Sequence, residues 1–195
     1  MSEYTAIRAV SQTLKMLLEE HITNISEPEL TGVPIDLRSP KEMREDNQTG
    51  ISLWLYRIVR DGDLLNHPPP RPAPDQRSRH ALPILLYYLV TPLKAKPEDE
   101  QALMGRVLQV FNDHAILRGS DLEDALAGSS EELRLIFEVP TLEELTRVWD
   151  ALQEPYQLSV IYMVQVVKID SAHEPIQAKP VLVKETEYAQ ILAVN

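Results

Sequence analysis

The side chains with the greatest potential for chemistry are five histidines, which are scattered along the chain: His21, His67, His80, His114 and His173. No two have the spacing of a helical metal site such as H-E-x-x-H, in which two ligands one turn apart face the same ion. Asp113 and His114 are adjacent, so their side chains point in different directions, and the dipole favours a histidine at the end of a helix. The histidines therefore predict neither a metal centre nor a catalytic pair.

Nucleophile and phosphate-binding motifs are missing. The absence of cysteine excludes thiolate nucleophiles, disulfides and cysteine-ligated zinc. The sequence also contains no G-x-S-x-G, no G-x-x-x-x-G-K-[ST] and no G-x-G-x-x-G. We therefore predict a protein that is not an enzyme and that needs no cofactor. A small enzyme whose site is assembled from residues far apart in the sequence is the less favoured alternative.

Carboxylates are abundant but poorly placed for catalysis. The adjacent pairs Glu131/Glu132 and Glu143/Glu144 would diverge on a strand or lie at the solvated start of a helix, unlike the facing carboxylates of a glycosidase. Asp61-Gly62-Asp63 follows an apolar run, but no further carboxylates follow at the spacing of a calcium loop. These residues predict a turn.

A basic cluster lies in a proline-rich connection. Residues 67–74 are polyproline-like and therefore stiff. The connection has no interleaved aromatic residues, so stacking on nucleic-acid bases is not expected. Its basic groups could instead meet an acidic patch on a neighbour. We predict an interface arm whose candidate contact residues are His67, Pro68, Pro69, Pro70, Arg71, Arg77 and Arg79.

Strands flank this arm. Residues 51–60 and 84–91 carry large apolar side chains at odd and even positions, which predicts central strands buried on both faces. Residues 4–21 repeat apolar side chains at helical spacing and predict an amphipathic helix. Residues 26–49 contain three prolines and a charged stretch, and predict a loop with a short strand over 35–38.

The second half mixes helices and strands. Pro97, followed by three acidic residues, predicts a helix that ends near His114. Two capping-box patterns, Ser120/Glu123 and Thr141/Glu144, predict helices that start at about 121 and 142. Residues 133–139 alternate as a strand exposed on one face, with Leu133, Leu135 and Phe137 on the buried side.

Residues 158–169 predict an unusually long strand. At about 3.3 Å per residue it would span roughly 40 Å, about twice the usual length. Such a strand bends at a bulge or projects past its sheet, where its free backbone groups can pair with something else.

The net charge of −11 belongs to the second half of the chain, because residues 1–97 hold equal numbers of basic and acidic side chains. A field of this sign repels phosphate backbones and disfavours nucleic-acid binding. The longest apolar run is far shorter than the roughly 20 residues of a membrane span, and no secretory signal is evident. The length of 195 residues fits one domain.

Four blocks in order carry a family resemblance: ISLWLYRIV, LPILLYYLVTPL, MGRVLQVFNDHAIL and WDALQEPYQLSVIYMVQVVKID. The most specific is the W-x-A-L-x-x-P-Y-x-L-S-V-x-Y run from Trp149 to Tyr162. On these blocks the chain resembles the tail-terminator, or cap, proteins of phage-tail-like extracellular contractile injection systems, in the family of uncharacterised N-terminal cap domains.

The resemblance implies an α+β fold in which a mixed or mainly antiparallel sheet of about four strands is packed by helices, as in phage tail terminators. It implies a structural assembly protein that caps the distal end of the inner tube and contractile sheath as a six-fold ring and ends polymerisation. The implied partners are copies of itself, tube and sheath proteins, with no nucleic acid and no membrane. It would be cytoplasmic during assembly and then part of the particle. A baseplate or adaptor component of the same particle is the alternative.

We expect a single domain over residues 1–185, with the proline-rich arm over 62–83 and a tail over 186–195. Trp149 is expected to share a helix face with Leu142, Leu145 and Leu152. The predicted anchors of the core are Trp54, Tyr88, Phe111, Trp149 and Tyr162.

Overall fold

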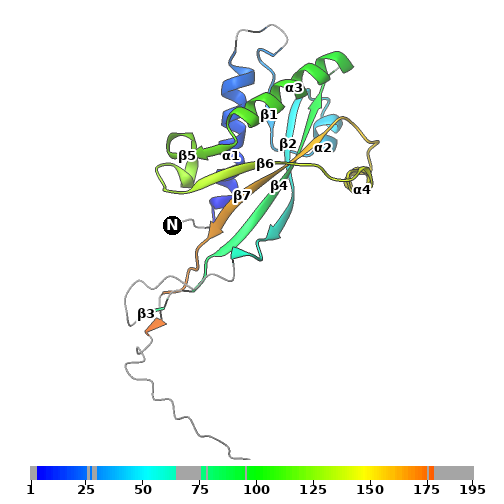
Figure 1. The fold of residues 1–195 in the computed structure, drawn as a ribbon. Helices are drawn as coiled ribbons and strands as arrows, with labels where there is room; N and C mark the ends of the chain where they lie inside the picture. Colours follow the sequence, from blue (N-terminus) through cyan, green and yellow to red (C-terminus); the bar gives the residue numbers. More distant parts are fainter. Residues whose placement is uncertain are drawn as a thin grey trace, which may run out of the picture.

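The computed structural model describes residues 4–25, 27, 30–64, 76–77, 79–94, 96–174 and 176–177. In these residues a six-stranded sheet has the strand order β1-β2-β4-β7-β6-β5, and a separate two-stranded sheet joins β3 to β8 beyond one end of it (Figure 1). The neighbours in the large sheet are antiparallel except β1 and β2. The predicted α+β class with a mixed sheet is confirmed, and short edge strands raise the strand count above the expected four.

Three long strands form the body of the sheet, and β6 joins them on one side. The long strands are β2 (Gly50–Arg60), β4 (Leu82–Leu93) and β7 (Val160–Ile169). The others are β6 (Glu132–Glu138), the edge strands β1 (Ile35–Asp36) and β5 (Ile116–Arg118), and the two separate strands β3 (Gln76–Arg77) and β8 (Ile176–Gln177).

β2 lies inside the sheet, between β1 and β4, as expected of a central strand, but it is fully buried only in its first residues. Only Ile51 and Ser52 pair with β1, whereas β2 pairs with β4 along its length. Beyond Ser52 no described strand covers the outer side of β2, and Ile58 is 49% exposed. Apolar residues on both faces of a strand do not reveal whether it is the second or the third strand from the edge of the sheet. Strands at both positions bury similar side chains near the middle of the sheet.

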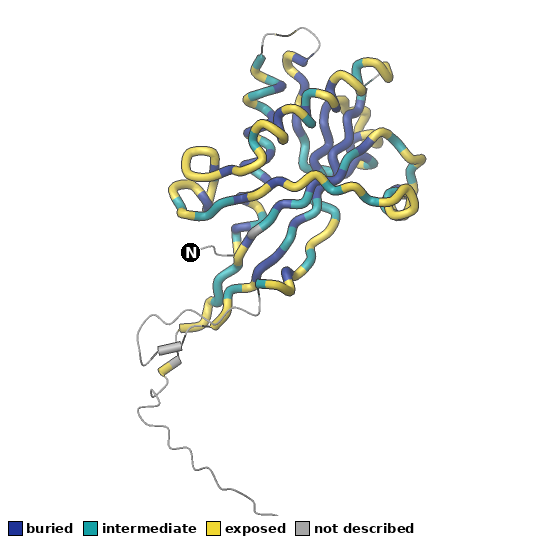
Figure 2. The backbone as a smooth tube through the Cα atoms, in the orientation of Figure 1, coloured by how far each residue is buried: buried dark blue, intermediate teal, exposed yellow. Residues whose placement is uncertain are grey.

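α1 (Ala6–Leu18) and α3 (Pro97–Asp113) cover one face of the sheet and form the main core with it. α1 continues into a π-helical segment, Glu19–Thr23, so the predicted helix over 4–21 is present. Figure 2 shows buried backbone concentrated where these helices meet the strands. Tyr88 lies in this core with its hydroxyl 2.8 Å from Ser11 Oγ, and burial raises the pKa of Tyr88 well above its usual range.

α4 (Leu142–Leu152) lies against the other face and forms a second, smaller core. Thr141 caps it as predicted, since its Oγ1 accepts from the N–H of Glu144, whose carboxylate accepts from the N–H of Thr141. Trp149 and Leu152 pack against Leu89 and Ile161. Leu142, expected on the same buried face, is 68% exposed because it lies in the first turn, beyond the reach of the sheet.

α2 (Pro40–Glu45) replaces part of the loop predicted over residues 26–49, and that interpretation was wrong. Ser39 and Glu42 form a complete capping box, and proline occupies the first turn. This is the same kind of capping-box signature, serine or threonine followed three residues later by glutamate, that predicts α4 from Thr141 and Glu144. The signal was present in the sequence but hidden by the neighbouring prolines and charges.

The helix predicted to start at about 121 does not form, so that prediction was also wrong. Two short 3₁₀ turns, Gly119–Asp121 and Asp124–Leu126, stand in its place. The N–H of Glu123 donates to Thr13 Oγ1 of α1 at 3.0 Å, and Asp124 has φ 52°, outside the helical range. A contact with a distant helix therefore overrides the local pattern.

β7 both bends and projects, which are the two outcomes expected of an overlong strand. Its register with β4 shifts between Ile84 and Leu86, where β7 has one extra residue. β6 pairs with β7 only from Ile161 to Gln165, whereas β4 accompanies it to Ile169. The end of the β4–β7 pair therefore extends past β6. Among the described helices, none is long and apolar enough to cross a membrane.

Candidate functional site

The histidines do not assemble a metal centre in the described part of the chain. His21 and His114 meet edge to face with ring centroids 4.5 Å apart. His114 Nδ1 lies 3.0 Å from the carbonyl oxygen of Val110, and His21 Nδ1 is buried without a hydrogen-bond partner. Over the described residues, no group of three or more side chains could hold a metal ion.

The predicted interface arm lies largely beyond what the structure describes. His67, Pro68, Pro69, Pro70 and Arg71 fall outside the described residues. The backbone of Arg77 belongs to β3, which pairs with Ile176 of β8, and Arg79 is exposed. The far end of the arm is therefore joined to the C-terminal part of the chain, and the interface role of the arm stays a prediction.

An aromatic groove of about 660 Å³ lies between α4 and the sheet face that α4 partly covers. We define this aromatic groove by residues of β2 and β4 on one side and by the end of β6, the following loop and α4 on the other: Trp54, Tyr56, Arg57, Tyr87, Glu138, Val139, Glu144, Arg147 and Val148. Trp54, predicted as a core anchor, is only half-buried and lines this groove.

A β-bulge in β2 gathers the aromatic rings. The register between β2 and β4 shifts between Leu55 and Arg57, leaving Tyr56 as an extra residue. The Tyr56 ring then lies 6.1 Å from that of Trp54 and 6.4 Å from that of Tyr87. The Arg57 guanidinium stands 5.4 Å from the centre of the Tyr87 ring, within the range of a cation–π contact.

The groove is suited to binding rather than to proton transfer. Burial raises the pKa of Tyr56 above its ordinary value, so its phenol stays neutral at physiological pH. Hydrogen bonds from the N–H and hydroxyl of Thr141 hold the pKa of Glu144 below its usual range, so this carboxylate stays charged. Neither group is near the pKa that a general acid or base needs at neutral pH.

Exposed apolar side chains surround α4. Val139 is 82% exposed immediately before the helix, and Tyr156 and Leu158 are exposed after it. We call Val139, Leu142, Tyr156 and Leu158 the α4 surface. Contiguous exposed apolar patches mark sites of protein–protein contact, and these four side chains are the candidates for such a patch near α4.

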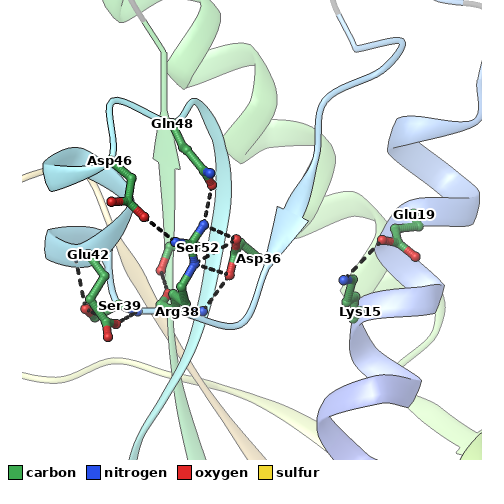
Figure 3. A network of polar contacts seen from close by, with 9 residues as sticks. All are labelled: Lys15, Glu19, Asp36, Arg38, Ser39, Glu42, Asp46, Gln48 and Ser52. Carbon is green, nitrogen blue, oxygen red and sulfur yellow. Dashed lines mark hydrogen bonds and ion pairs between the residues drawn. The ribbon is translucent and has the colours of Figure 1, made fainter.

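A polar network braces the corner of the fold that supports α4. Arg38 donates to Asp36 at 2.7 Å, to Asp46 at 2.6 Å and to Gln48, and its carbonyl oxygen accepts from Ser52 Oγ (Figure 3). These bonds hold the pKa of Asp36 below its ordinary value. The network joins β1, α2 and β2. Because the Arg38 guanidinium is hydrogen-bonded within the network, we assign Arg38 a structural role.

α2 is linked in turn to α4, because Arg44 lies 3.5 Å from Glu154 just beyond the end of that helix. The polar network thus supports the element that forms one wall of the aromatic groove. Tyr56, Arg57 and Tyr87 were not among the residues predicted to form a site, and Leu142 of the α4 surface was expected to be buried. The sequence held a signal for the groove, because Trp54 and Tyr56 are two residues apart and so share one face of the strand. The bulge that adds Arg57 to that face depends on pairing with β4.

Two solved structures share this fold. One is described as the sheath/tube terminator of an extracellular contractile injection system, PVC, in its extended state; it has a TM-score of 0.65 and 19% identity over 100% of this chain. The other is described as the tube-terminating cap of the anti-feeding prophage, AFP, with a TM-score of 0.60 and 18% identity over 92% of this chain. The present chain spans 67% and 60% of the lengths of those chains.

A comparison with curated proteins finds no match. The model of one protein family, described as the Pvc16 N-terminal domain, matches residues 9–182. This match begins within α1 and extends past β8, and it includes the four sequence blocks that carried the resemblance. The chain therefore belongs to the Pvc16 N-terminal domain family.

Proposed function

We propose that this chain is a non-enzymatic cap that ends the inner tube and the contractile sheath of a phage-tail-like injection particle. The observation that carries the proposal is the family match over residues 9–182, in a fold shared with a sheath/tube terminator and a tube-terminating cap. The aromatic groove and the α4 surface support it, because they offer contact area without a catalytic set of residues.

The proposed partners are tube and sheath proteins together with further copies of the chain in a six-fold ring. A head-to-tail ring buries two different surfaces of each subunit. The uneven charge of the two halves of the sequence, neutral over residues 1–97 and acidic beyond, is compatible with two unlike surfaces. Charge pairs at an exposed rim contribute only about 0–1 kcal/mol each, so we expect the ring to close on the end of the tube and sheath. The protein would assemble in the cytoplasm and remain in the extracellular particle.

Deletion of the gene from a cluster that also encodes tube, sheath and baseplate tests the proposal directly. Without a terminator, tube and sheath should reach variable lengths, as seen by negative-stain electron microscopy, and re-expression of the chain should restore uniform shafts. Unchanged shaft lengths would contradict the proposal. Gold-labelled copies at the baseplate end would favour the baseplate or adaptor alternative.

The α4 surface provides a sharper test with a matched control. Val139→Asp combined with Leu142→Asp should abolish co-sedimentation of the chain with assembled shafts. Met16→Asp changes an exposed apolar residue on α1, on the opposite face of the sheet from α4, and should leave co-sedimentation unchanged. Circular dichroism should confirm that both variants are folded. Equal binding by all three proteins would exclude the α4 surface as the shaft contact.

A further inference from the structure

The sheet has a free edge at the second half of β6. β5 pairs with β6 only at residues 132–134, and the last bond on this side runs from the N–H of Leu135 to the carbonyl oxygen of Ala115. In an antiparallel strand, alternate residues direct their backbone groups to the same side. The N–H and C=O of Phe137 therefore face this edge, where no described strand covers them.

An apolar pocket of about 460 Å³ lies directly beside the free edge. Leu108 and Phe111 of α3 form the apolar part of one wall, beside the polar Gln109 and Asn112, and Leu135 and Phe137 of β6 form the other wall. The Phe137 ring lies 5.4 Å from that of Tyr162, which in turn meets Phe111 at 4.7 Å. Phe137 is nevertheless 49% exposed, although the sequence placed it on the buried side of its strand. The pocket and the edge together form what we call the β6 acceptor.

The sequence contains a segment of matching chemistry after β8. Val181, Leu182 and Val183 form a short apolar run of high β-propensity, with Lys179 and Lys184 on either side. Pro180 precedes the run, at the position where a proline does not interrupt strand pairing. On the acceptor side, the exposed acidic residue Asp113 closes α3. The apolar run therefore matches the apolar lining of the pocket, and its flanking lysines are opposite in charge to Asp113.

The same chain cannot fill its own acceptor with this run. Phe137 pairs with Tyr162, which lies about 23 Å from Ile169 along β7 at about 3.3 Å per residue. β8 lies farther still in that direction (Figure 1). Leu182 is five residues after Gln177 and reaches no more than about 18 Å from it. A second copy of the chain is thus the source that the geometry favours.

We propose that residues 180–184 of one copy add a strand to β6 of the next copy, with apolar side chains in the pocket between β6 and α3. This inference rests on the proposed function, because a ring at the end of the shaft places copies side by side. The added strand would continue the line of β5 and satisfy the backbone groups of Phe137. It would also make the contact directional, since the donor segment and the acceptor lie on different parts of each copy.

Cysteine cross-linking tests the proposal cleanly because the natural sequence has no cysteine. Ile136→Cys in one tagged chain is mixed with single-cysteine variants at each of positions 180–185 in a second, differently tagged chain. After mild oxidation in the presence of assembled shafts, we expect heterodimers of twice the chain mass. Their yield should alternate with position, because side chains of a paired strand alternate between faces. The matched control is Ile58→Cys on the free edge of β2, which should give no heterodimer.

Three outcomes would overturn the proposal. The first is the absence of heterodimers, the second is a yield that does not vary with position, and the third is a cross-link within one chain when both cysteines are placed in the same molecule. If shafts are capped but no heterodimer forms, the strand addition is wrong and the cap function stands. If the chain does not bind shafts, the cap function fails, and cross-linking of the concentrated free protein still decides the strand addition.

A donor substitution tests the same contact without altering the acceptor. Leu182→Asp should lower the number of copies retained per shaft end at least ten-fold, as measured by native mass spectrometry of released caps. Thr186→Asp adds the same charge outside the apolar run and should retain the parental number. Equal retention by the two variants would contradict the proposal.

Discussion

Trp149 links α4 to the sheet through packing and through one hydrogen bond. Its side chain is 1% exposed, and its Nε1–H donates to Ser159 Oγ at 3.2 Å. Tyr156 contacts the indole edge to face at 6.3 Å. The second core contains few other large buried side chains, so this residue supplies much of the apolar area that keeps the helix in place.

Trp149→Ala should lower the free energy of unfolding by about 3–5 kcal/mol, because it leaves a cavity that the sheet cannot fill. Ser159→Ala should cost only about 1–3 kcal/mol, since it leaves the indole N–H without its partner but keeps the packing. Urea denaturation followed by circular dichroism measures both. A Trp149→Ala protein with an unchanged midpoint would contradict the anchoring role.

Three carboxylates should make the fold sensitive to acid. Hydrogen bonds from Arg38 lower the pKa of Asp36, those from Ser39 lower that of Glu42, and those from Thr141 lower that of Glu144. A carboxyl whose pKa is lowered in the folded state stabilises the protein at pH values above its unfolded-state pKa of about 4. This stability is lost as pH falls through the folded-state pKa.

We therefore expect the free energy of unfolding to decrease as pH is lowered from about 4. Glu42→Gln should be less stable at neutral pH and should show a shallower decrease below pH 4. Denaturation curves collected at several pH values test this expectation. The exposed Glu143→Gln is the matched control and should keep the parental slope, so identical slopes for all three proteins would refute the assignment.

At the scale of elements, periodicity identified α1 and the long strands, because each buries one stripe or both faces over many residues. Helix-start signals identified α3 and α4. Short elements were the ones that the sequence misassigned. α2 has only six residues, and its capping box stands among prolines and charges. The false helix near 121 has the same S-x-x-E pattern, but a contact from Thr13 takes the N–H of Glu123. The local pattern alone could not show that a helix forms after Ser39 and not after Ser120.

The two S-x-x-E patterns make a direct comparison possible. Ser39→Ala removes a hydroxyl that accepts from the N–H of Glu42 and should cost about 1 kcal/mol. Ser120→Ala alters an exposed serine without a helix to cap, and should stay within about 0.5 kcal/mol of the parent. Thermal unfolding of the two variants measures the difference. A larger loss for Ser120→Ala would mean that the 3₁₀ turns depend on its side chain.

For the whole molecule, the sequence could not specify the order of strands or the aromatic groove. The β2–β4 pairing that creates the bulge at Tyr56 connects Leu55 to Tyr88 and Arg57 to Tyr87, which are far apart in the sequence. Trp54 illustrates the limit: alternation assigns its side chain to a face, but only the position of α4 decides how much of that face is covered. The candidate arm residues could be proposed from composition, and their contacts stay a prediction.

The arm itself should be dispensable for folding. Arg60 pairs with Ile84 and the N–H of Asp61 donates to the carbonyl oxygen of Pro83 at 3.0 Å, so the β2–β4 pair is closed without it. Replacement of residues 66–75 by a Gly-Ser linker of equal length should leave the thermal midpoint unchanged and abolish binding to shaft ends. A lowered midpoint would show that the arm is structural, and retained binding would show that it is not an interface.

The projecting pair of β4 and β7 also has a mechanical consequence. The chain leaves the body at Ile169, and β7 is bonded to β4 along its whole length. Antiparallel backbone bonds lie perpendicular to the strands. Tension applied at Ile169 along the strand therefore acts on these bonds in shear, so they must yield together rather than open one after another. A contracting sheath that pulls on the C-terminal segment would transmit its force to the folded body through the connection best able to resist it.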